Sequence, residues 1–204
     1  MKLFKYIAFA FVATLFGCNQ KEMKISRAGV TILSEMTDFS PAYIEKNEKG
    51  EALLNDNNLI GNTHWVISTE RDLKLHQIAP FLQKLTDKKF NKEGMHPDDK
   101  NIYFVYSDTV NKQNAYVKMP FKTILLDPLP QDEPEIGSSV FYAIDSDIKY
   151  KEILKSKLSI ADQLIKIYME INPTITVEQF VALLIAIDEE NKDKKMEYPS
   201  IAIY

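Results

Sequence analysis

Eight consecutive apolar residues near the C-terminus, FVALLIAI at residues 180–187, constrain the fold more than any other stretch of the chain. Thr176 and Gln179 precede them at the spacing of a capping box, in which each side chain bonds the backbone of the other, so a helix is predicted to begin there. A helix that is apolar on nearly every side must be buried against a sheet or between helices. The alternative interpretation of this run is a buried strand.

A second capping box, Ser159 with Asp162, predicts another helix just before this one. Its apolar face is expected to consist of Ile160, Leu164, Ile167, Tyr168 and Ile171. Pro173 separates the two helices, because proline cannot donate the backbone hydrogen bond that a continuous helix needs. The chain is therefore predicted to end with a helix pair, followed by a last strand within residues 198–204.

Short runs of β-branched and aromatic residues predict the strands. They lie at residues 28–36, 59–68, 102–107, 114–126 and 140–144. The short link between 102–107 and 114–126 favours a hairpin there. Polar residues, glycine and proline predict loops, and these are expected at residues 45–58, 91–99 and 127–139.

A helix is also expected after the second strand, because Thr69 and Asp72 together form a helix-start signal. Its buried face is predicted to consist of Leu75, Ile78, Ala79, Leu82 and Leu85. Several successive strands have no helix between them. The fold class is therefore predicted to be α+β, with a mainly antiparallel sheet, a helix after the second strand and a C-terminal helix pair.

The single cysteine of this 204-residue chain, Cys18, follows a segment with the features of a secretory signal peptide. Lys2 and Lys5 give a positive start, and residues 6–16 are apolar apart from Thr14. A membrane-spanning helix needs roughly 20 apolar residues, so this segment is too short for a permanent span. Residues 1–17 are therefore predicted to be a signal peptide.

Residues 15–18, with the sequence LFGC, resemble the lipobox of bacterial lipoproteins, although Phe16 is larger than the residue usual in that family. The resemblance implies that Cys18 becomes the first mature residue and carries lipid on its thiol, which anchors the protein to a membrane. It divides the chain into a signal peptide (1–17), a lipidated tether (18–27) and a single α+β domain (28–204). The alternative is a cleaved signal peptide with a bystander cysteine.

The residues after Cys18 bear on the location within the cell envelope. Residues 19–24, NQKEMK, partly resemble the signals that send some Bacteroidetes lipoproteins to the cell surface. Asn19 is not the aspartate that retains many lipoproteins at the inner membrane, so the resemblance implies the outer membrane. It leaves open which face of the membrane carries the protein.

Charge and composition exclude several functions. A net charge of −4 with no basic cluster argues against nucleic acid as a partner. With Cys18 lipidated, the mature chain has no disulfide and no cysteine zinc site. His64, His76 and His96 lack the spacing of a helical zinc site, so no metal and no cofactor are expected.

The expected function is that of a non-catalytic, lipid-anchored envelope protein that binds another macromolecule, for example an immunity-type protein that neutralises a basic effector. The acidic side chains of Asp132, Glu133 and Glu135 are candidates for docking such an effector.

The alternative is an envelope hydrolase that acts on peptidoglycan, peptide or glycan through paired carboxylates. The candidates for these carboxylates are Asp145, Asp147 and Glu152. His64 beside Trp65 has two interpretations, a platform for sugar or peptide and a wall residue of the fold.

Overall fold

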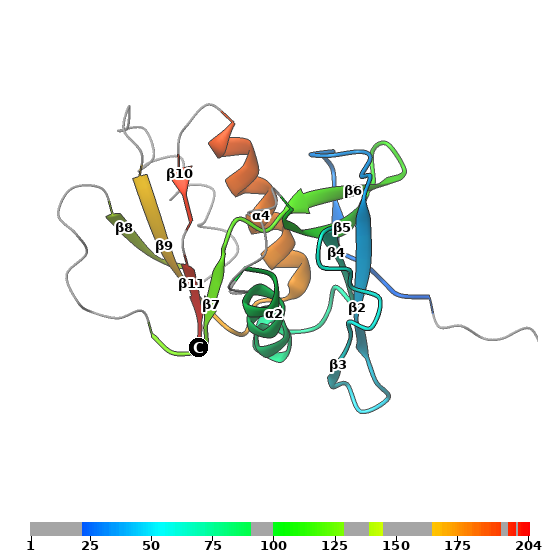
Figure 1. Ribbon diagram of the computed structural model, residues 1–204, viewed down its shortest axis with the longest axis horizontal. Helices are drawn as coiled ribbons and strands as arrows, with labels where there is room; N and C mark the ends of the chain where they lie inside the picture. The colour runs from blue at the N-terminus through cyan, green and yellow to red at the C-terminus, as the bar shows by residue number, and fades with distance from the viewer. Residues whose placement is uncertain (1–21, 91–99, 129–138, 145–164, 193–195, 199) are drawn as a thin grey trace, which may run out of the picture.

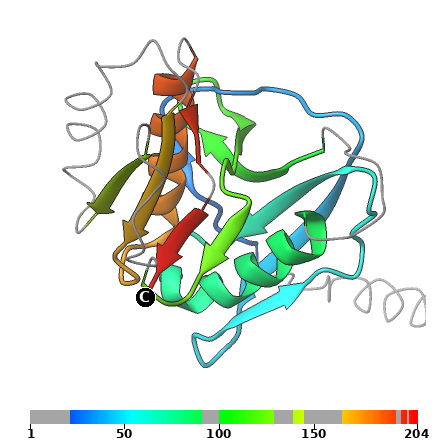
Figure 2. The same cartoon turned by 60° about the vertical axis from the view of Figure 1, so that its left-hand side comes forward.

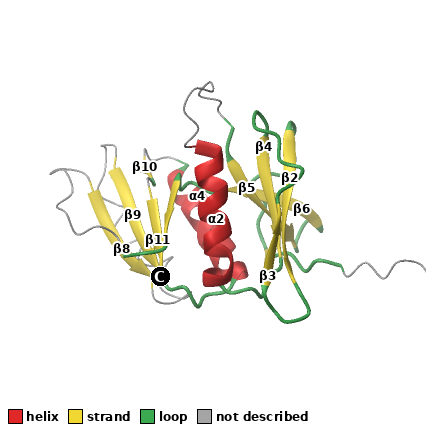
Figure 3. Cartoon of the chain, turned by 60° about the horizontal axis from the view of Figure 1, so that its bottom comes forward, coloured by secondary structure: helices red, strands yellow, loops and turns green. Residues whose placement is uncertain are grey.

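Two helices lie between two sheets, which gives the described part of the protein three layers (Figure 1, Figure 3). The computed structural model describes residues 22–90, 100–128, 139–144, 165–192, 196–198 and 200–204. Within these ranges, the side chains of residues 139–144, 165–167 and 196 are left undescribed. Apolar residues from both sheets and both helices join in one core.

The first sheet, called sheet I, has six strands. They are β1 (Arg27–Ala28), β2 (Phe39–Lys46), β3 (Ala52–Asn55), β4 (His64–Thr69), β5 (Ile102–Asp108) and β6 (Gln113–Lys118). The order is β1-β5-β4-β2-β3, with β6 also paired to β5. The pairs β1–β5, β5–β4 and β4–β2 are parallel, whereas β3 and β6 run antiparallel to their neighbours. The hairpin predicted between 102–107 and 114–126 is confirmed as β5 and β6.

The second sheet, called sheet II, has five strands. They are β7 (Thr123–Leu125), β8 (Ser139–Ile144), β9 (Ile165–Ile171), β10 (Met196–Glu197) and β11 (Ser200–Ile203). All of its pairings are parallel. The predicted strands at 140–144 and near the C-terminus are confirmed as β8 and β11.

Helix α2 (Leu75–Phe90) connects β4 to β5. All the residues predicted for its buried face are buried, namely Leu75, Ile78, Ala79, Leu82 and Leu85. The helix begins later than its predicted start signal, because β4 continues through Thr69 and the next backbone N–H, of Glu70, still donates to Ile44 at 3.2 Å.

Helix α4 (Val177–Asn191) contains the FVALLIAI run, so its prediction as a helix is confirmed. The predicted capping box is present, since Gln179 N–H donates to Thr176 Oγ1 at 3.2 Å and Thr176 N–H donates to Gln179 Oε1 at 2.7 Å. Apolar residues occur all around this helix because it lies in the middle layer, with a sheet on either side (Figure 2). Phe180, for example, packs edge-on against Phe104 of sheet I, with 5.8 Å between ring centroids.

Two halves of the chain have the same order and pairing of elements. In this arrangement β2, β4, α2 and β5 correspond to β8, β9, α4 and β11. The register of β2 on β4 runs from the pair Phe39 and His64, and that of β8 on β9 runs from Ser139 and Lys166. Each helix follows the central strand of its half. Backbone groups at the N-terminus of α2 form hydrogen bonds with backbone groups at the N-terminus of α4. The two halves therefore meet at the N-termini of these helices.

The prediction of a mainly antiparallel sheet was wrong, because most strand pairs are parallel. A helix connects β4 to β5 and another connects β9 to β11. Such a crossover returns the chain in the same direction, so these neighbouring strands are parallel. The coarser prediction of an α+β fold is confirmed.

The predicted C-terminal helix pair was also wrong, since residues 165–171 form strand β9. This segment, IKIYMEI, contains β-branched isoleucines that pack well in a sheet. It has parallel partners on both sides, with β8 on one and β10 and β11 on the other. Residues 159–164, which carry the predicted start of that helix, lie outside the described part.

Two predictions near the N-terminus also differ from the structure. Residues 45–58, predicted as a loop, contain the end of β2 and all of β3, which form an antiparallel hairpin. Residues 28–36, predicted as a strand, contribute only the end of β1 and an isolated bridge from Leu33 to Tyr116. The hairpin was not predicted because many of its residues are polar. Polar residues are compatible with a strand here, since one face of this sheet is open to solvent.

Residues assigned to the tether are part of the folded chain. Arg71 N–H donates to Lys24 O at 2.9 Å, and Ser107 N–H donates to Ser26 O at 2.8 Å. The side chain of Ser26 is buried. The described chain therefore joins sheet I at about Lys24. Residues 1–21, including the predicted signal peptide and Cys18, lie outside the described part.

Candidate functional site

The face of sheet I that is turned away from the helices carries a groove of about 750 Å³. In Figure 1 this face is on the right, where the chain enters the sheet from its N-terminal side. The lining residues come from β2, β4, β5, β6 and the segment before β1. They are Met23, Ile25, Phe39, Pro41, Tyr43, Glu45, Lys46, Val66, Ser68, Glu70, Val105, Asn114 and Tyr116.

The floor of the groove contains apolar side chains together with the hydroxyl of Ser68, and its rim is aromatic. Val66 and Val105 are only 3% and 7% exposed, although they point to the face without helices. The rings of Phe39 and Tyr116 meet above the sheet with 6.5 Å between centroids. Tyr43 follows on the same face of β2. The groove therefore offers ring faces and apolar contact of the kind that ligand sites use.

One end of the groove is acidic. Glu45 follows Tyr43 on the outer face of β2, and Glu70 follows the end of β4. Glu70 is only 6% exposed, and its Oε2 accepts a hydrogen bond of 3.3 Å from the backbone N–H of Lys24. Lys46 lies at the same end, but its ammonium group is paired with Asp72.

The N-terminal segment forms part of the wall. Met23 and Ile25 line the groove, and the backbone bonds made by Lys24 and Ser26 hold this segment against the sheet. The groove is thus next to the stretch of chain that leads back to Cys18.

A second buried carboxylate, Asp108, has a structural role. It accepts hydrogen bonds from the side chains of Thr31 and Asn111 and from the backbone N–H groups of Val110 and Asn111, the last two at 2.8 and 3.0 Å. These bonds, with Thr31 the largest contribution, lower the pKa of Asp108 to about 2. They fasten the β5–β6 turn, where Lys112 has a φ of +53°.

The predicted pair His64 and Trp65 does not form a platform in the groove. Trp65 is 2% exposed, and its indole N–H donates to Ile60 O at 2.8 Å. His64 Nδ1 accepts from Asn101 N–H at 3.1 Å. Burial, followed by the nearby charge of Lys100, lowers the pKa of His64. The interpretation as wall residues of the fold therefore fits the structure.

Most other predicted site residues cannot be placed. Cys18, His96, the docking candidates Asp132, Glu133 and Glu135, and the catalytic candidates Asp145, Asp147 and Glu152 lie outside the described part. His76 lies in the first turn of α2, and its Nδ1 is 3.0 Å from Pro173 O.

None of the helices formed by the described residues is long and apolar enough to cross a membrane. The described residues contain no cluster of three or more His, Cys, Asp or Glu side chains that could hold a metal ion.

The groove was not predicted from the sequence, although β2 carries a signal for it. Along β2, buried Ser40, Ala42 and Ile44 alternate with Phe39, Pro41, Tyr43 and Glu45. This period of two is typical of a strand with one open face. No element was predicted for residues 37–44, and the polar residues from Glu45 onward were predicted to form a loop.

Comparison of this chain with protein-family models, with curated proteins and with solved structures finds no match.

Proposed function

We propose that the protein is a non-catalytic, lipid-anchored protein of the cell envelope that binds another macromolecule through the groove of sheet I. The observation that carries this proposal is the combination of aromatic rings, apolar side chains and an acidic end on a sheet face that no described helix covers. Aromatic residues are enriched where proteins bind partners, because they bury a large area with few rotatable bonds.

Lipid attachment at Cys18 would determine where the groove works. Only a few residues separate Cys18 from Glu22, the first described residue, and an extended chain spans at most ~3.6 Å per residue. The described chain enters sheet I from the side that carries the groove (Figure 1, Figure 3). The groove would then lie close to the lipid headgroups, and its partner would be one that reaches the membrane surface. The outer membrane is the location that the sequence favours.

The anchor is tested by Cys18→Ser. The wild-type protein should partition with membranes and incorporate a palmitate analogue, whereas the variant should be unlabelled and soluble in the periplasm. A wild-type protein that is soluble and unlabelled would end the lipoprotein part of the proposal.

The groove is tested by placing a photo-crosslinking amino acid at Tyr43 in living cells. Tyr204 is the control, because it is a tyrosine that is more exposed than Tyr43 but lies at the C-terminus beside sheet II (Figure 1). A discrete adduct from position 43 and none from position 204 is the expected result. Equal adducts from both positions, or none from position 43, would reject the groove as the binding surface.

An immunity-type role is one concrete form of this function, since an acidic groove suits a basic effector. A second candidate, an envelope hydrolase, is favoured by one observation, that Glu45 and Glu70 line the same groove and could act as paired carboxylates. Release of soluble products from peptidoglycan, lost in both Glu45→Gln and Glu70→Gln, would support the hydrolase over the binding protein.

A further inference from the structure

Glu45 and Glu70 lie side by side on neighbouring strands. The last registered pair of β2 and β4 is Ile44 with Thr69. The N–H of Glu70 then donates to Ile44 O at 3.2 Å, which places the two glutamates at the next position. Both line the groove. Like charges on adjacent strands repel each other, so this pair of glutamates lowers the stability of the folded chain.

The described residues do not supply a cation for this pair. A carboxylate as buried as Glu70 is normally paired or fully hydrogen-bonded. No side-chain nitrogen of a described lysine or arginine lies within 4.0 Å of a carboxylate oxygen of either glutamate. Lys46 is paired with Asp72, and Arg71 is directed to Glu178 at 3.9 Å.

Asp108 and Glu70 differ in how many hydrogen bonds their carboxylates accept, and Asp108 is the structural one. Asp108 is fully buried and accepts bonds from two side chains and two backbone N–H groups. Glu70 is nearly as buried but accepts one long bond, and it borders a groove. The fold leaves acceptor capacity on Glu70 that a ligand can use.

We infer that the acidic end of the groove binds a lysine or arginine side chain from an extended segment of a partner protein. This inference rests on the proposed function and names the chemistry of its partner. The cationic group would reach Glu45 and Glu70 through charge-assisted hydrogen bonds. The ring of Tyr43, next to Glu45 on the same face, would contact the cation or its apolar stem.

The shape of the groove supports a peptide segment over a small free cation. Its volume of about 750 Å³ exceeds that of one side chain, and it extends from the acidic end to the rings of Phe39 and Tyr116. The intervening floor presents the apolar side chains of Pro41, Val66 and Val105 beside the hydroxyl of Ser68. Residues that flank the basic side chain would therefore find contacts along the rest of the groove.

The test uses the purified chain and three blocked alanine pentapeptides, with arginine, lysine or glutamine at the centre. Backbone amide signals are followed by NMR during titration. We expect the arginine and lysine peptides to shift the signals of Tyr43, Glu45 and Glu70, and the glutamine peptide to leave them unchanged. An equal response to the glutamine peptide, or none to the basic peptides, would overturn the inference.

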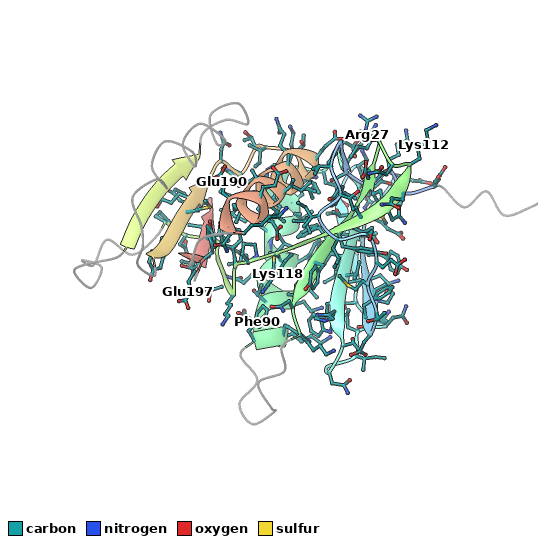
Figure 4. All side chains as sticks on the ribbon, turned by 90° about the horizontal axis from the view of Figure 1, so that it is seen from above. Arg27, Phe90, Lys112, Lys118, Glu190 and Glu197 are labelled. Atoms are coloured by element: carbon teal, nitrogen blue, oxygen red, sulfur yellow. The ribbon has the colours of Figure 1, made fainter. Side chains whose placement is uncertain are left out.

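Isosteric variants supply the control. Glu70→Gln and Glu45→Gln should each raise the Kd of the arginine peptide about tenfold, because each removes one charge-assisted contact. Glu189→Gln makes the same charge change at an exposed position in the last turn of α4 and should leave the Kd unchanged. Its neighbour Glu190 is on the side of the molecule near sheet II in Figure 4, away from β2. Equal weakening in all variants would reject a specific acidic site.

Calcium chloride alone is the remaining probe. If calcium shifts the same signals and displaces the arginine peptide at micromolar concentration, the site is a metal site and the inference is wrong. Failure of this inference is distinguishable from failure of the proposed function. Adducts at position 43 in cells, without binding of a basic peptide, would leave the groove as the partner surface and reject only the basic chemistry.

Discussion

The backbone N–H of Leu75 donates to the carbonyl of Ile175 at 2.8 Å, which joins the first turn of α2 to the residues that precede α4. The N–H of Val177 returns a bond of 2.9 Å to Leu73 O. The first N–H groups of a helix have no partner within the helix. Here the N–H groups at the start of each helix donate to carbonyls from the segment before the other helix, so backbone hydrogen bonds join the two halves of the molecule at this place.

The capping box beside this junction gives the first prediction. Thr176→Ala should lower the free energy of unfolding by about 1 kcal/mol, because it removes the side-chain acceptor of Gln179 N–H. Thr174→Ala, at an exposed position just before the helix, is the control and should cost less. Denaturant unfolding measures both. Equal effects of the two changes would contradict a specific role for the cap.

The burial of α4 gives the second prediction. Leu184→Ala should cost on the order of 2 to 5 kcal/mol, since Leu184 is fully buried between the layers and truncation leaves a cavity. The same change at Leu53, which is 54% exposed on β3, should cost less than about 0.5 kcal/mol. Chemical denaturation of both variants separates a core helix from an exposed binding helix. A cost below about 0.5 kcal/mol at Leu184 would reject its burial.

The pH dependence of stability tests the Asp108 cluster. Hydrogen bonds to the carboxylate lower its folded pKa from 3.8 to about 2, so the unfolded chain takes up the proton first as the pH falls. The stabilisation is present above about pH 4 and is lost between there and pH 2. Asp108→Asn should therefore be less stable at neutral pH and show a flatter decline in this range.

Asp127→Asn, at an exposed position after β7, is the control for that experiment. Its stability should follow the wild-type curve throughout the acid range. Other paired aspartates, such as Asp38 and Asp72, remain in both variants, so the difference between the curves reports Asp108. Parallel curves for wild type and Asp108→Asn would show that the cluster is not formed in solution.

The start of the folded chain gives the fourth prediction. A chain that begins at Glu22 should unfold in one thermal transition. A chain that begins at Ala28 should be about 2 kcal/mol less stable, because it lacks the two backbone bonds to Lys24 and Ser26. Equal stability of the two would show that this segment is a tether after all.

Resistance to chelators is the fifth prediction. We expect EDTA to leave the melting temperature of the chain from Glu22 unchanged, since the chain has no cysteine beyond position 18 and the described part has no cluster of metal ligands. A fall in the melting temperature that added zinc or calcium reverses would reveal a metal site.

Local features were predictable where short-range physics decides them. The period of apolar residues determined the buried face of α2, and the Thr176–Gln179 spacing determined the start of α4. Both depend on contacts between residues three or four positions apart. Strand β9 was missed for the opposite reason, since its isoleucines fit one face of a helix as well as a strand and its pairing partners decided between them.

From the sequence alone it was predictable that residues 180–187 form a buried helix, that β5 and β6 form a hairpin, and that the fold is α+β. Only the tertiary structure decided that most strand pairs are parallel, that both helices lie between two sheets, and that Glu45 and Glu70 share a groove. The physical reason is distance along the chain. Propensity, capping and hairpin turns act between near neighbours, whereas strand direction and the meeting of side chains from separate strands depend on how the whole core packs.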